Sequence, residues 1–190
     1  MKRAVLSLFL ILIYTSIYAS TIVIYITPEF VVLAADSKGV YTNAKTFKKE
    51  TRTVPKIFKT GDYYFSLTGV VSNTTRSFDV GKVINNRLKN EADLSKAITQ
   101  IKEEVANSLK LYLSYNKKHN PSLFKKDLEL GNYITSIGII GIKNNKPYAH
   151  ILGFKIINTA SLDIKTEEDF CPSANSVSTI YYLGKSDAIK

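Results

Sequence analysis

The first part of the chain alternates between short apolar runs and turn residues, a pattern that predicts strands. Residues 21–27 (TIVIYIT) are β-branched and aromatic, which is typical of a strand. Turn residues at 28–29 separate them from residues 30–35 (FVVLAA), a nearly continuous apolar run. Such a run predicts a strand that is buried on both faces. Residues 45–54 are polar and basic, and we expect a loop or short edge strands there.

Further strands are expected on both sides of a central helical region. Gly61-Asp62 is a hairpin turn signal between two short apolar runs. After the helical region, apolar strands return on either side of a turn at residues 143–146. The predicted strands are residues 56–58, 63–68, 133–142, 148–157 and 179–183.

After Gly69 the apolar spacing changes to that of helices. The apolar residues between Phe78 and Leu88 predict a first helix, and Asp93 is a good N-cap for a longer one. One stripe of the longer helix carries Leu94, Ala97, Ile98, Ile101, Val105, Leu109 and Tyr112. The order of strands, two helices and strands favours an α+β layered domain with helices packed on antiparallel sheets.

The N-terminal segment has the pattern of a secretory signal peptide. Lys2 and Arg3 precede an apolar run from residue 4 to residue 14, and residues 15–19 are smaller and more polar. Cleavage after Ala19 fits the preference for small residues better than cleavage after Ser20. We therefore expect a signal peptide at residues 1–19, a single domain at residues 20–190, and a secreted or periplasmic protein.

An uncleaved membrane anchor is the alternative for this segment. Residues 4–27 carry no charge, and an uncharged stretch of this length is long enough for a transmembrane helix. The strand-like composition of residues 21–27 argues against that interpretation. A membrane partner is expected only if the segment is retained.

Composition excludes several other function classes. The chain has 190 residues and a net charge of +10, and removing residues 1–19 with Lys2 and Arg3 would leave +8. Because basic composition alone gives only non-specific attraction, we expect no nucleic-acid partner. One cysteine, Cys171, excludes an internal disulfide framework and a cysteine-rich zinc site. His119 and His150 are 31 residues apart without nearby acids, so we expect no metal and no cofactor.

The predicted strands also carry residues at a characteristic spacing. Asp36 ends the run VVLAAD sixteen residues after Ser20, Lys56 begins KIFK, and Gly69 ends SLTG. This ordered set resembles the start of mature proteasome β-type subunits, which are N-terminal nucleophile hydrolases. The resemblance is strong over residues 20–70 and fits in outline to residue 184. It implies a four-layer αββα sandwich with two antiparallel sheets. From the same resemblance we also expect a homo-oligomer.

The resemblance also implies a role for each of these residues. Ser20 would be the nucleophile, and its free α-amine, with a reference pKa of about 7.7–8.0, would be its base. Lys56 would favour the neutral amine by like-charge repulsion, and Asp36 would hold that lysine within ion-pair reach. The Gly69 N–H would stabilise the oxyanion formed from a peptide or other amide substrate. Thr21 is the fallback nucleophile if cleavage falls one bond later.

Some positions depart from the family pattern. The nucleophile is Ser rather than Thr, and Ala19 stands where self-processing precursors have Gly, so a signal peptidase would have to free Ser20. The family's supporting Asp and Ser would fall beyond residue 190, so either the chain is truncated or those supports are missing. A catalytically inactive structural or binding protein of the same fold is therefore an alternative, as is a membrane-anchored protein with an uncleaved N-terminus.

Overall fold

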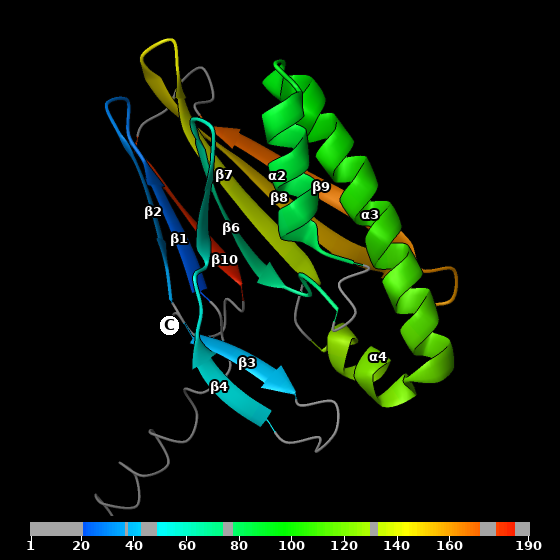
Figure 1. The fold of residues 1–190 in the computed structure, drawn as a ribbon. Helices are drawn as coiled ribbons and strands as arrows, with labels where there is room; N and C mark the ends of the chain where they lie inside the picture. Colours follow the sequence, from blue (N-terminus) through cyan, green and yellow to red (C-terminus); the bar gives the residue numbers. More distant parts are fainter. Residues whose placement is uncertain are drawn as a thin grey trace, which may run out of the picture.

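A computed structural model of the chain describes residues 21–36, 38–42, 49–73, 78–129, 133–171 and 178–184. The predicted signal peptide, residues 1–19, and Ser20 lie outside the described residues. The elements, labelled in Figure 1, are β1 (Thr21–Ile26), β2 (Val31–Ala35), β3 (Lys38–Thr42), β4 (Lys49–Thr53), β5 (Ile57–Thr60), β6 (Tyr63–Gly69), α2 (Val80–Asn90), α3 (Leu94–His119), α4 (Pro121–Leu128), β7 (Thr135–Lys143), β8 (Lys146–Asn158), β9 (Asp163–Cys171) and β10 (Thr179–Gly184).

The elements form three layers. A five-stranded antiparallel sheet has the order β5-β6-β7-β8-β9, and a three-stranded antiparallel sheet has the order β10-β1-β2. Helices α2 and α3 cover one face of the larger sheet, and the smaller sheet lies against its other face (Figure 1). Strands β3 and β4 form a separate hairpin. The chain is thus α+β with two antiparallel sheets, as the sequence predicts.

Two apolar cores hold these layers together. The core between the helices and the larger sheet includes Ile101, Leu109, Ile137, Leu152 and Phe154, all fully buried. The core between the two sheets includes Ile22, Ile24, Ile26, Ile140 and Leu183. Because burying a side chain of this size contributes about 1.5–3 kcal/mol, these cores fix the layer order.

The helices begin at the caps that the sequence supplies. The Asp93 carboxylate accepts a hydrogen bond from the Ser95 N–H at 2.9 Å, which confirms the predicted N-cap of α3. The predicted stripe of α3 is buried up to Leu109, and Tyr112 is half-buried against the same core. The first predicted helix begins at Val80, directly after its own cap, Asp79. No helix among the described residues is long and apolar enough to cross a membrane.

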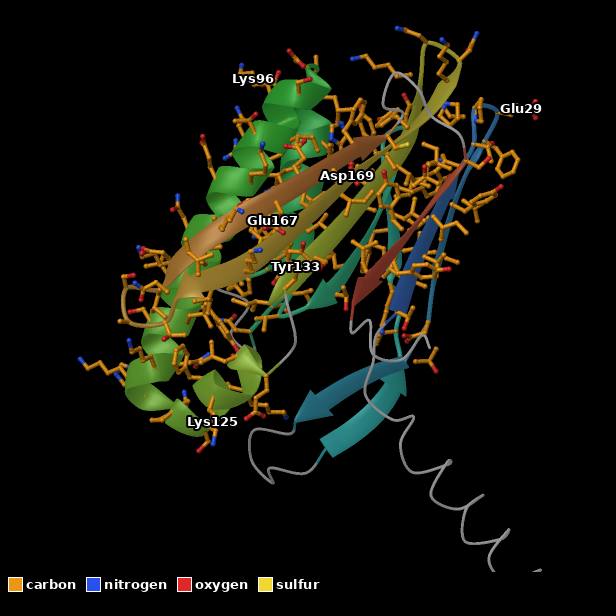
Figure 2. All side chains as sticks on the ribbon, turned by 180° about the vertical axis from the view of Figure 1, so that it is seen from behind. Glu29, Lys96, Lys125, Tyr133, Glu167 and Asp169 are labelled. Atoms are coloured by element: carbon orange, nitrogen blue, oxygen red, sulfur yellow. The ribbon has the colours of Figure 1, made fainter. Side chains whose placement is uncertain are left out.

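The sequence prediction missed β3, α4 and β9. Strand β9 (DIKTEEDFC) is rich in charged residues because it is the edge of the larger sheet, where charged side chains face solvent. Figure 2 shows Glu167 and Asp169 on this strand, and Glu167 accepts a hydrogen bond from the Tyr133 hydroxyl at 2.6 Å. A polar strand of this kind gives little apolar signal in a sequence.

The prediction that residues 30–35 are buried on both faces is wrong. Val31, Leu33 and Ala35 pack against the intersheet core, but Val32 is 46% exposed. The same outer face of the smaller sheet carries Ile180 and Tyr182, which are also exposed. In the described part of the chain no helix covers this face, so the arrangement there is αββ rather than the expected αββα.

Candidate active site

Asp36 lies where β2 ends beside the first residue of β1. The Asp36 N–H donates to the Thr21 carbonyl at 3.2 Å, which continues the antiparallel ladder by one residue. The Thr21 N–H donates to Asp36 Oδ2 at 2.8 Å. A side-chain carboxylate thus accepts from the backbone amide that is covalently joined to Ser20.

Lys56 reaches the same carboxylate from the larger sheet. It directly precedes β5, and its Nζ lies 2.9 Å from Asp36 Oδ1. Its side chain is only 10% exposed, whereas the Asp36 side chain is 35% exposed. Since a lysine is rarely buried without a paired charge, the carboxylate explains how this ammonium is accommodated. The expected contact between Lys56 and Asp36 is present, and it joins the two sheets.

The backbone of Lys56 is also held in place. The hydroxyl of Ser66, a fully buried residue of β6, donates to the Lys56 carbonyl at 2.6 Å. The register of β5 and β6 pairs Ile57 with Ser66, which brings the hydroxyl beside this carbonyl. Sequence reasoning missed this role of Ser66. A serine within the mainly apolar run YYFSL was its only signal.

Gly69 lies at the same end of the larger sheet as Lys56. It ends β6 opposite Thr135, with φ at +88°. A Cβ at this position would lie 1.9 Å from the Ile134 carbonyl oxygen, so only glycine fits. The glycine thus has a structural requirement of its own, and its role as an oxyanion donor stays a prediction.

Thr21, the fallback nucleophile, is the first residue of β1. Ile22, Ile24 and Ile26 face the intersheet core, whereas Thr21 lies on the opposite face of the strand. The Thr21 side chain is half-buried. The backbone amide of Thr21 contacts the Asp36 carboxylate.

The histidines lie elsewhere in the fold. His119 is exposed in the last turn of α3, where its ring stacks on Tyr115. His150 in β8 is buried, and its Nδ1 lies 3.2 Å from Glu168 Oε1 in β9. The expectation that His150 has no nearby acid is therefore wrong, because β9 brings one. The described residues contain no cluster of three or more His, Cys, Asp or Glu that could hold a metal ion.

Comparison of the chain with protein-family models and with curated proteins finds no match. The spacing of Ser20, Asp36, Lys56 and Gly69 and the contacts of Asp36 are therefore the features that bear on function.

Proposed function

We propose that the chain is an exported, proteasome-like N-terminal nucleophile hydrolase that cleaves peptide or other amide bonds with Ser20. The observation that carries this proposal is the shared carboxylate of Asp36. It accepts from the backbone amide joined to Ser20 and also pairs with the largely buried Lys56 ammonium. Under this proposal, the Ser20 α-amine and hydroxyl would lie close to the Lys56 ammonium.

The proposed reaction uses the α-amine that cleavage after Ala19 would create. The neutral amine removes the proton from Ser20 Oγ as the oxygen attacks the amide carbonyl carbon. The carbon–nitrogen bond then breaks, the leaving amine takes that proton, and an ester on Ser20 remains. Water hydrolyses the ester and regenerates the serine.

Lys56 and Asp36 would tune this amine rather than exchange protons with the substrate. A cation beside the terminal amine disfavours its protonated form, which cannot act as a base. Asp36 keeps the cation in position, and Ser66 keeps the lysine backbone in position. The Gly69 N–H would donate to the oxyanion.

The structure of β1 favours Ser20 over Thr21 as the nucleophile. Even-numbered residues of β1 face the apolar core between the two sheets. Lys56 precedes a strand of the larger sheet, which forms the other side of that core. Because side chains alternate along a strand, we expect the Ser20 side chain to face the same side as Ile22, whereas the Thr21 side chain faces the opposite side.

The first test is the N-terminus of the exported protein. Intact-mass measurement should give a chain that begins at Ser20. A chain that begins at Met1 contradicts the mechanism, because the α-amine would then be far from the site, and it favours the membrane-anchored alternative. A start at Thr21 would transfer the nucleophile to Thr21.

The second test is covalent labelling with a β-lactone. Attack by Ser20 Oγ opens the lactone ring, so the protein should gain the full mass of the probe on Ser20. The Ser20→Ala variant should gain none. Lys56→Ala should label much more slowly, whereas Lys125→Ala, which removes a lysine from α4, should label like the wild type (Figure 2).

An inactive structural protein remains the second candidate, and one observation favours it. The Lys56–Asp36 pair joins the two sheets, and the Ser66 hydrogen bond holds the Lys56 backbone within the larger sheet, whether or not Ser20 reacts. This candidate predicts a folded protein with a free Ser20 α-amine that neither β-lactones nor amide substrates modify.

A further inference from the structure

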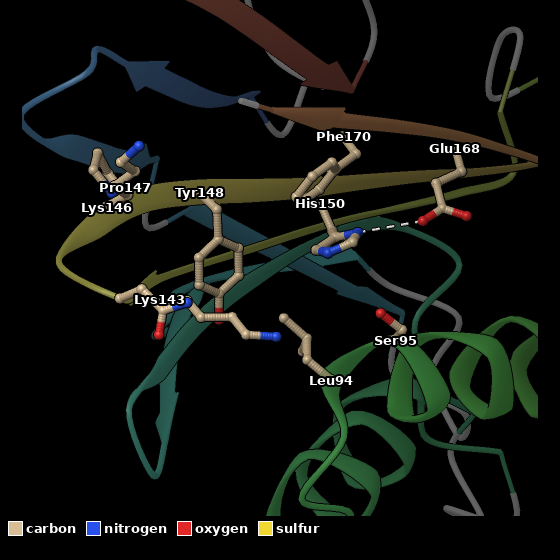
Figure 3. Close-up of a pocket in the computed structure, with 10 residues that line it drawn as sticks. Leu94, Ser95, Lys143, Lys146, Pro147, Tyr148, His150, Glu168 and Phe170 are labelled. Carbon is tan, nitrogen blue, oxygen red and sulfur yellow. Dashed lines mark hydrogen bonds and ion pairs between the residues drawn. The ribbon is translucent and has the colours of Figure 1, made fainter. Parts of the chain in front are cut away.

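A pocket of about 440 Å³ lies between the turn that joins β7 to β8 and the first turn of α3 (Figure 3). It is on the helix-covered face of the larger sheet. Gly69 pairs with Thr135 at one end of β7, and the pocket adjoins Lys143 at the other. Eight residues of strand separate these ends by roughly 26 Å. The pocket is therefore distinct from the Asp36–Lys56 site and independent of the proposed function.

One side of the pocket is apolar and another is basic. Leu94, Pro147, Tyr148 and Phe170 supply apolar and aromatic surface. Lys143 and Lys146, on either side of the turn, supply two cations. The Lys143 side chain extends towards Leu94 in Figure 3. The volume falls in the range of small-molecule sites, which are mostly apolar with a few polar groups.

A polar group that lines the pocket is His150, which contacts Glu168, and Glu168 in turn pairs with Lys102. Glu168 Oε1 lies 3.2 Å from His150 Nδ1, and Glu168 Oε2 lies 2.7 Å from Lys102 Nζ. The Phe170 ring packs on the imidazole with centroids 4.4 Å apart. These contacts fix the plane of the imidazole and hold Nδ1 at Glu168.

The charges around His150 also set its protonation state. Burial lowers the pKa of His150, and the cations of Lys102 and Lys143 lower it further, against the raising effect of Glu168. Burial alone would raise the pKa of Glu168, but the Lys102 hydrogen bond brings it below its ordinary value. At neutral pH the Nδ1–H of a neutral imidazole thus donates to the Glu168 carboxylate. Among the described residues Nε2 has no hydrogen-bond partner, and it lies on the side of the ring away from Glu168 (Figure 3).

We propose that this pocket binds a small organic carboxylate with an aromatic or other apolar body and a hydroxyl or N–H donor. The body packs against Leu94 and Tyr148, and the carboxylate pairs with Lys143 and Lys146. The donor reaches Nε2 of His150, a hydrogen bond that the neutral ring can accept. Each part of such a ligand has a matching group in the pocket.

The test uses 4-hydroxyphenylacetate, which has all three features. The chain contains only two histidines, so NMR of the imidazole Hε1 protons gives two signals that His119→Gln assigns. The ligand should shift the His150 signal with a dissociation constant on the order of millimolar, as expected for a ligand of about eleven heavy atoms. The exposed His119 should not respond.

Matched ligands and variants test each part of the proposal. The neutral 4-hydroxyphenylacetamide and the hydroxyl-free phenylacetate should each bind several-fold more weakly. Lys143→Met should raise the dissociation constant of 4-hydroxyphenylacetate about fivefold or more, since it removes a charge-assisted contact. Lys125→Met, the same change on α4, should leave it unchanged. An unshifted His150 signal at high ligand concentration, equal affinity for the amide and the acid, or equal affinity of Lys143→Met and wild type would overturn the proposal.

Discussion

Asp127 in α4 is a buried carboxyl group whose protonation should control part of the stability of the fold. It is 7% exposed, and the Tyr112 hydroxyl of α3 hydrogen-bonds to it. Burial raises the pKa of Asp127 from 3.8 to about 6. Within the described chain, Asp127 Oδ2 and the nearby Asn116 Nδ2 have no hydrogen-bond partner. The folded protein therefore favours the neutral carboxyl group.

The sign and size of the pH dependence follow from this raised pKa. Below pH 3.8 the group is largely protonated in both the folded and the unfolded state, so its ionisation does not lower the free energy of unfolding. As the pH rises through about 6, the folded state must ionise a group that burial disfavours, and stability is lost. Between about pH 4 and pH 7.5 the free energy of unfolding should fall by about 2–3 kcal/mol through Asp127 alone.

The perturbation that tests this is Asp127→Asn, which keeps the shape and removes the charge. The new amide N–H would take the unpartnered position of Oδ2, at a cost of about 1 kcal/mol that does not depend on pH. The variant should therefore gain about 2–3 kcal/mol relative to wild type when the pH is raised from 4 to 7.5. Urea unfolding followed by circular dichroism at the two pH values measures this difference from the midpoint and slope.

The control is Asp62→Asn, which removes the same charge from the exposed turn between β5 and β6. It corrects for the change in net charge. If Asp127→Asn changes the free energy of unfolding by the same amount at both pH values, the carboxyl group is not disfavoured in its ionised form, and the reasoning is refuted.

Three further predictions concern the backbone, a helix cap and the candidate site. Gly69→Ala should destabilise the fold by more than about 3 kcal/mol, because φ is +88° and a Cβ would overlap a carbonyl oxygen. Gly61→Ala, where φ is +55° and the space around a Cβ is open, should cost about 1 kcal/mol. Equal losses in urea unfolding would contradict this. Asp93→Ala should cost about 1 kcal/mol as α3 loses its cap, and an unchanged unfolding midpoint would argue against that cap. Lys56→Ala should lower amide hydrolysis about 10²–10⁴-fold while circular dichroism shows a retained fold, and full activity would refute its role.

Features that depend on neighbours along the chain can be predicted from the amino-acid sequence. The cap at Asp93 and the apolar stripe of α3 follow from helical spacing, and the structure confirms both. The turn at Gly61-Asp62 is also as predicted. At the candidate site, the family resemblance identified Asp36 and Lys56 in advance, and their contact is present.

Which distant residues meet, and which faces are covered, depends on the packing of the whole chain. Ser66 reaches the Lys56 carbonyl, and Glu168 reaches His150, because of the registers of β5 with β6 and of β8 with β9. The run at residues 30–35 is apolar on both faces, yet the outer face of β2 is exposed among the described residues. The spacing of apolar residues predicts which face of a strand is buried, but the pairing of that strand depends on the free energy of the whole packed structure. For that reason the sequence predicts elements and turns, whereas strand register and layer order are properties of the folded chain.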